Sequence, residues 1–151
     1  MHKHFDTLEK SRALILRIID GLTIDQLNTT PTGFNNNIVW NIAHLVVTQQ
    51  LLCYRMSGID CLVSDELIDT YRKGTSPSEP VSAEEFERIK TLLTTLPIQL
   101  KEDYNTGIFQ SYKEYTTSVD VSLNSIDDAI VFNTFHEGAH LGIILQLKKL
   151  V

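Results

Sequence analysis

Apolar residues recur at helical spacing in four long stretches of this 151-residue chain. In the first stretch the apolar residues follow the spacing of the buried face of a helix: Phe5, Leu8, Ile15, Ile18, Ile19, Leu22. The second opens at Asn36 or Asn37, whose side chain can accept a hydrogen bond from the free amides of a helix start, and it stops near Ser57 and Gly58. The predicted helices span about 5–22, 37–57, 82–97 and 125–149.

The third and fourth stretches begin with local capping signals. Ser82 and Glu85 form the S-x-x-E pattern of a capping box, and Pro97 is expected to kink or end the helix that follows. Ser125 and Asp128 give the last helix a similar start.

Two connecting segments lack a helical pattern over most of their length. Residues 58–80 are irregular, with at most a short helix over Asp65–Tyr71. Residues 107–123 alternate Tyr, Thr and Val; we interpret them as irregular, with a short strand pair or an extended crossover as the alternatives.

Four helices of this length indicate an all-α protein, a four-helix bundle formed by a single domain over residues 1–151. The long connection between the second and third helices can carry the chain along the whole bundle. Those two helices can then run parallel, which makes the second and fourth antiparallel neighbours.

Charge and composition narrow the function classes. The formal charge is 13 − 19 = −6, and no basic stripe is present, so we expect neither nucleic acid nor an anionic membrane as a partner. No apolar run reaches the length of a membrane span or of a signal peptide, which predicts a cytoplasmic protein. Cys53 and Cys61 do not form a CxxC pair and are expected to be buried thiols.

Three histidines lie on apolar helical faces. His136 and His140 are four residues apart in the last helix, so both imidazoles can reach one ion, and His44 lies on the apolar face of the second helix. A buried polar group without a partner costs about 1–3 kcal/mol, so histidines on core faces need an explanation. We predict that His44, His136 and His140 bind one divalent metal ion, whereas any one of them alone would be read as a hydrogen-bonded core histidine.

Five further residues each allow two interpretations of their role. Asn133 either orients a ligand or caps a core cavity, and Glu137 is expected at the surface or behind the ligands. The aromatic residues either line a pocket or belong to the hydrophobic core: Trp40, Tyr54 and Phe132.

The segment His136-Glu137-Gly138-Ala139-His140 also matches the H-E-x-x-H pattern of zinc metalloproteases, with Glu137 as general base. Only 11 residues follow His140, and none of them is His, Asp or Glu. A third ligand must therefore come from upstream, which makes a protease the weaker hypothesis.

Three segments of the chain resemble the DinB-like superfamily, the DinB/YfiT-type metalloenzymes. They are Asn37-Ile38-Val39-Trp40-Asn41-Ile42-Ala43-His44-Leu45, the helix start Asp127-Asp128-Ala129, and His136-x-x-x-His140-x-Gly142. The family's three metal histidines map onto His44, His136 and His140.

The resemblance implies an up-down-down-up four-helix bundle, often a homodimer, whose open three-histidine site takes Ni, Zn, Fe or Mn. It also implies a small-molecule substrate. Several relatives use a low-molecular-weight thiol such as bacillithiol, mycothiol or glutathione as co-substrate, and transfer it to electrophiles. A metal-dependent thiol transferase or hydrolase is thus the expectation, and a non-catalytic metal-binding or dimerising bundle is the alternative.

Overall fold

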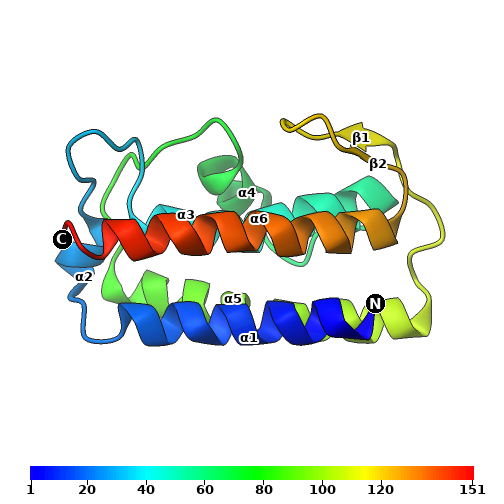
Figure 1. Ribbon diagram of the computed structural model, residues 1–151, viewed down its shortest axis with the longest axis horizontal. Coiled ribbons are helices and arrows are strands. Elements are labelled where there is room, and N and C mark those ends of the chain that lie inside the picture. The colour runs from blue at the N-terminus through cyan, green and yellow to red at the C-terminus, as the bar shows by residue number, and fades with distance from the viewer.

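The computed structural model describes residues 1–151 and is mostly helical. Four long helices lie side by side along the longest axis of the molecule: α1 (His2–Ile19), α3 (Ile38–Gln49), α5 (Ala83–Thr106) and α6 (Ile126–Leu147) (Figure 1). α1 and α3 each contact both α5 and α6. The colours of Figure 1 show that α1 and α6 run in one direction, whereas α3 and α5 run in the other.

Short elements connect these helices: α2 (Ile24–Asn28), the π-helical η1 (Gln50–Tyr54), the 3-10 turn η2 (Arg55–Ser57), α4 (Asp65–Tyr71), and strands β1 (Tyr115–Thr116) and β2 (Ser122–Leu123). β1 and β2 pair antiparallel, with Tyr115 opposite Leu123. None of the helices combines the length and the apolar composition that crossing a bilayer requires.

The capping signals of the sequence are confirmed. Asn37 Oδ1 accepts a 2.8 Å hydrogen bond from the Trp40 amide at the start of α3. Ser82 and Ser125 accept hydrogen bonds of 3.1 Å at the starts of α5 and α6 from the amides three residues on. Each cap satisfies an amide that has no partner within the helix.

Predictions for the connections are partly confirmed. α4 spans Asp65–Tyr71, as the sequence indicated. Residues 107–123 were predicted to be irregular, with a short strand pair as one alternative. The structure contains that strand pair. The first helix ends at Ile19 rather than Leu22, since Gly21 adopts a left-handed φ of 83° and Thr23 caps the separate helix α2.

Pro97 does not end α5, which continues to Thr106. A proline has no amide to donate to the carbonyl four residues earlier, which here belongs to Leu93. That carbonyl instead accepts a 3.0 Å hydrogen bond from Arg12 Nη1 of α1. The expectation that Pro97 could end the helix was therefore wrong, and a side chain distant in sequence supplies the missing donor.

Two apolar clusters fill the interior. On α1, Leu8 belongs to one cluster and Ile15 to the other, and the fully buried Arg12 lies between them. On α6 the buried residues include Ile130, Asn133, Glu137 and Ile144. The face of α6 that is buried differs from the predicted one. Glu137 points into the core, whereas His136 and His140 are only half-buried.

Candidate metal centre

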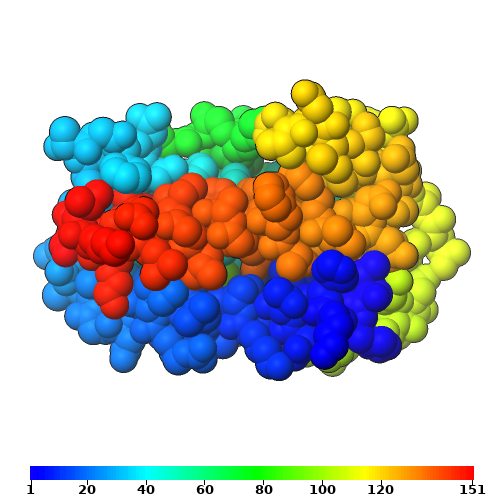
Figure 2. Space-filling model, viewed as in Figure 1, coloured from blue at the N-terminus to red at the C-terminus, as the bar shows by residue number.

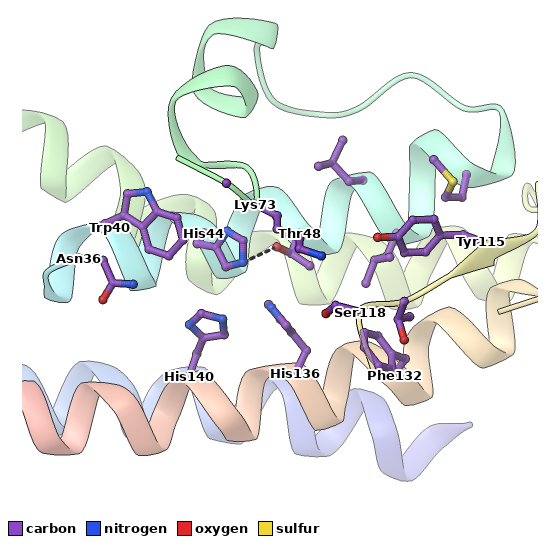
Figure 3. Close-up of a pocket in the computed structure, with 15 residues that line it drawn as sticks. Asn36, Trp40, His44, Thr48, Lys73, Tyr115, Ser118, Phe132, His136 and His140 are labelled. Carbon is purple, nitrogen blue, oxygen red and sulfur yellow. Dashed lines mark hydrogen bonds between the residues drawn. The ribbon is translucent and has the colours of Figure 1, made fainter. Parts of the chain in front are cut away.

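The three histidines predicted from the sequence lie together between α3 and α6. His44 comes from α3, and His136 and His140 come from successive turns of α6 (Figure 3). Their ring centroids are 4.5–5.2 Å apart. One nitrogen from each ring lies within 4.8 Å of the others, so the group can hold a metal ion.

His44 is held in one orientation by two contacts. Its Nδ1 lies 2.6 Å from the carbonyl oxygen of Tyr71, and since a carbonyl only accepts, Nδ1 carries the proton. The Trp40 ring stacks on the imidazole at 4.6 Å with an interplanar angle of 11°. Nε2 of His44 therefore presents a lone pair, toward which the Thr48 hydroxyl donates at 3.2 Å.

His140 is oriented by a chain of amides at the start of α3. Its Nδ1 lies 2.8 Å from Asn41 Oδ1. Asn41 Nδ2 donates to the Asn37 carbonyl at 2.7 Å and to Asn36 Oδ1 at 3.0 Å, which fixes the direction of the Asn41 amide. His140 Nδ1 must then be the donor, and Nε2 is left with a lone pair. Such outer hydrogen bonds are the usual supports of metal-binding imidazoles.

His136 has no hydrogen bond to any group of the chain, and its buried Nδ1 has no partner. A buried polar atom normally has one. Among the three histidines, His136 is therefore the one whose buried nitrogen can form a polar contact only with a partner that is not part of the chain. Three neutral imidazoles suit a divalent ion of the Zn, Ni or Fe type, so the residues fit such a metal, which at His44 would take the place of the Thr48 hydroxyl.

Burial keeps all three imidazoles neutral at physiological pH. It lowers the pKa of His136 to about 3, with a further contribution from His140 and His44. Burial and the neighbouring His44 lower the pKa of His140 to about 4. Burial also lowers the pKa of His44, although the hydrogen bond to the Tyr71 carbonyl opposes the shift. A neutral imidazole is the form that binds a metal ion.

These shifts predict how stability varies with pH. Below pH about 6.5 the histidines of the unfolded chain take up protons, whereas those of the metal-free folded protein do not, so the free energy of unfolding falls as the pH falls toward about 4. At pH 5 we expect a loss of about 1–2 kcal/mol for each of His136 and His140, or about 5–10 °C in Tm in total. Thermal melts in a chelator should show a shallower pH dependence for His136→Gln/His140→Gln than for wild type. Equal slopes would contradict this account.

A pocket of about 470 Å³ opens beside the histidines. Trp40 and Phe132 line it, as one reading of the sequence proposed, whereas Tyr54 lies in the core and donates to Asp103 Oδ2 at 2.6 Å. Apart from the amide of Asn36, the remaining walls are apolar, hydroxyl or small: Thr48, Leu51, Leu52, Met56, Gly74, Tyr115, Thr117, Ser118. One charged residue, Lys73, lines the pocket, and no carboxylate does.

Glu137 is not at the surface or behind the ligands, as the sequence suggested. It is 1 % exposed, and Arg12, also 1 % exposed, binds its carboxylate in the core with Nη2–Oε1 at 2.7 Å and Nε–Oε2 at 3.1 Å. Asn133 donates to the same carboxylate at 3.0 Å, so it supports the ion pair and not the metal site. A glutamate held in this way cannot act as general base beside His136 and His140. The H-E-x-x-H protease interpretation is therefore wrong.

Sequence reasoning missed Arg12. The available signal was a charged residue at a core position of α1, four residues after Leu8 and three before Ile15. Its partner, 125 residues later, could not be deduced from spacing. Both cysteines are free thiols; Cys53 is buried, as expected, whereas Cys61 is only half-buried.

The model of the DinB superfamily matches residues 7–144 of this chain. That range covers most of the protein and includes all three histidines. The chain belongs to the DinB superfamily. No curated protein matches the chain. The resemblance recognised in three sequence segments is thus confirmed at the level of the DinB family, with the three-histidine group between α3 and α6 as the feature that can hold a metal.

Proposed function

We propose that this DinB-superfamily protein is a divalent-metal-dependent enzyme in which His44, His136 and His140 are the metal ligands. The observation that carries the proposal is the meeting of three oriented or unpartnered imidazoles at one wall of an open pocket. Three protein ligands leave a coordination position for an exogenous group, which is the pattern of catalytic and not of closed structural sites.

The reaction that we propose is transfer of a low-molecular-weight thiol to an electrophilic small molecule. A bound divalent ion would supply Lewis-acid chemistry, lowering the pKa of a thiol that reaches it. In the transfer, the thiol sulfur forms a bond to the electrophilic carbon, the leaving group departs with its bonding electrons, and the thiol proton goes to solvent.

The residues around the candidate site have different roles in the proposed reaction. Asn41 and the Tyr71 carbonyl hold the ligand rings in place through their Nδ1 atoms. Trp40 and Phe132 provide apolar walls that accommodate the electrophile and limit access of water. The Thr48 hydroxyl, 3.2 Å from His44 Nε2, is placed to hydrogen-bond a group that enters beside the imidazoles.

The test follows consumption of glutathione or bacillithiol in the presence of 1-chloro-2,4-dinitrobenzene and added Zn or Ni. Wild-type protein should accelerate the reaction, and His140→Ala should fall to the uncatalysed rate. Equal rates for the two proteins would refute the transferase. If both proteins were inactive while wild type still bound one metal ion, the non-catalytic alternative would replace it.

Lys73 suggests that the substrate carries a negative charge. Its side chain extends from the loop after α4 toward the pocket, and it forms no ion pair with any carboxylate of the chain (Figure 3). The chain has 19 acidic residues, yet none lines this pocket, so the pocket is a positive site in an acidic protein. Glutathione and bacillithiol carry carboxylates, whereas mycothiol does not, and we propose that the former kind of thiol is preferred.

Replacing Lys73 with methionine keeps most of the length of the side chain and removes its charge. KM for 3-mercaptopropionate should rise by about tenfold, the value of one charged hydrogen bond, whereas KM for the neutral 2-mercaptoethanol should not change. Lys113→Met, outside the pocket, is the matched control. Equal increases for both thiols would show that Lys73 does not recognise the anion.

We also propose that α1, α3, α5 and α6 form the up-down-down-up bundle of this superfamily, as one domain. The supporting observations are the contacts of α1 and α3 with both other helices and the helix directions in Figure 1.

A further inference from the structure

The pocket beside the histidines extends well beyond them, along the continuation of α3 through η1 and η2. Figure 3 shows the imidazoles between Trp40 on one side and Tyr115 and Phe132 on the other. One ion held by three imidazoles fills only a small part of about 470 Å³, so most of the pocket is open to another group. The part on the side away from Trp40 is called the distal half, and these residues line it: Leu51, Leu52, Met56, Tyr115, Thr117, Phe132. In the space-filling view, the hairpin that carries Tyr115 and Thr117 lies over the start of α6 (Figure 2).

A row of side chains four residues apart forms one wall of the whole pocket: Trp40, His44, Thr48, Leu52, Met56. In an α-helix each step of four residues turns the side chain by about 40° beyond a full circle, so a long row of this spacing leaves the face on which it began. The π-helical turn η1 lies within the row. Its i→i+5 hydrogen bonds place more residues in each turn, so a step of four there turns the side chain the opposite way. The π turn therefore keeps Leu52 and Met56 on the same wall as His44.

The walls of the distal half carry no charge. The helix contributes only apolar side chains to it, and the hydroxyls of the hairpin are the polar groups on this side of the pocket. One of them, Thr117 Oγ1, already accepts a 3.2 Å hydrogen bond from the Val121 amide. Lys73 and Thr48 are drawn between the histidines and Tyr115, where the distal half begins (Figure 3). A charged group beyond them would lose its hydration without gaining a partner, so this space suits an apolar group.

Contacts of the backbone close the far end of the distal half. The Lys113 amide donates to the Met56 carbonyl at 2.6 Å, and Ser111 Oγ donates to the Ser57 carbonyl at 3.2 Å. These hydrogen bonds attach the segment before β1 to the end of η2, and Tyr115 follows two residues after Lys113. The distal half is therefore a space of limited length.

We propose that the distal half binds an unbranched alkyl chain of the electrophilic substrate. The proposal rests on the proposed function for the identity of the substrate, whereas the alkyl site itself requires neither metal nor catalysis. The Thr48 hydroxyl lies 3.2 Å from His44 Nε2, so Thr48 marks the end of the space nearest the candidate metal. Met56 is eight residues further, about 12 Å along a helix. An extended alkyl chain advances about 1.3 Å per carbon, since its bonds are about 1.5 Å long, so about nine carbons span that length.

Binding of 1-alkanols to the untagged full chain tests this site. The alcohols are neutral and do not react with thiols, so only the number of methylenes changes from 1-butanol to 1-dodecanol. Trp40 is the only tryptophan and lines the pocket, so its fluorescence reports binding there. We expect Kd to fall by about three- to fourfold for each added methylene. The decrease should stop at about nine carbons, where the chain reaches the closed end. A Kd that does not fall with chain length would overturn the proposal.

Truncation of Tyr115 tests the position of the closed end. Tyr115→Ala should lengthen the distal half, so that Kd continues to fall for alcohols longer than those at which it levels off in wild type. Val119→Ala is the matched control, because Val119 is on the same hairpin, is 54 % exposed and does not line the pocket. Circular dichroism melts would verify that both variants fold. The same length limit in wild type and Tyr115→Ala, or equal shifts in the two variants, would overturn the proposal.

A second assay separates this site from the proposed transferase. With glutathione and a series of 1-bromoalkanes, the sulfur would form a bond to the terminal carbon, bromide would leave with the bonding electrons, and the thiol proton would go to solvent. We expect kcat/KM to follow the same dependence on chain length as Kd for the alcohols. Binding of alcohols without consumption of bromoalkane would support the alkyl site and refute the transferase. Consumption at a rate independent of chain length would support the transferase and overturn the alkyl site.

Discussion

Replacing Arg12 with alanine is expected to lower the free energy of unfolding by about 3–5 kcal/mol, because the buried carboxylate of Glu137 then loses its charged partner. Domains of this size are stable by about 5–15 kcal/mol, so the loss would remove between about a fifth and all of that stability. The carbonyl of Leu93, which has no helical donor because of Pro97, would lose its partner at the same time. Urea denaturation monitored by circular dichroism measures the change.

Two controls separate loss of the ion pair from general damage to α1. Arg17 is exposed on the same helix and forms no ion pair, so Arg17→Ala should change stability by no more than about 0.5 kcal/mol. Replacing both charges, in Arg12→Met/Glu137→Leu, should recover most of the loss, since no buried charge is left unpaired. If Arg12→Ala were as stable as Arg17→Ala, the proposed role of the pair would be wrong.

Removing the His140 imidazole is expected to weaken zinc binding more than substituting the residue that orients it. Loss of a ligand-orienting group typically costs about 10–100-fold in metal affinity, which is the expectation for Asn41→Leu. His140→Ala removes the ligand itself and should exceed that range. Competition against a chromophoric chelator gives both dissociation constants. The opposite order of effects would show that His140 is not a ligand.

The removal of His140 should also stabilise the metal-free fold at acidic pH, where the folded protein excludes a proton that the unfolded chain binds. Weaker zinc binding by a variant of at least wild-type stability would exclude unfolding as the cause. A variant that is unfolded at neutral pH would instead show that the imidazole is mainly structural.

Signals local in sequence predicted much of the fold. The starts of α3, α5 and α6 could be placed from the sequence because each is capped by a nearby side chain. The capping residues are Asn37, Ser82 and Ser125, and each accepts a hydrogen bond from the amide three residues later. The short helix Asp65–Tyr71 was also found from its own residues. Histidines four apart on one helix, with a third on another apolar face, were enough to bring the candidate metal ligands together.

Contacts between distant segments were not accessible in this way. The local preference of Pro97 is the same wherever a proline occurs. The donor that the Leu93 carbonyl lacks because of Pro97 comes from Arg12, 85 residues earlier (97 − 12). Glu137 was interpreted through the H-E-x-x-H pattern because it stands between two histidines, whereas the rotation of α6 turns it toward α1. The order of side chains around a helix follows from the sequence, but the direction that faces the core depends on the neighbours.

X-ray absorption spectroscopy of the zinc-loaded protein tests the central claim most directly. Wild type should show scattering from three imidazole nitrogens at about 2.0–2.1 Å, with one ion per chain. His44→Ala should lose one imidazole from the first coordination sphere. A wild-type spectrum with fewer than three imidazoles, or one that His44→Ala leaves unchanged, would contradict a site shared between α3 and α6.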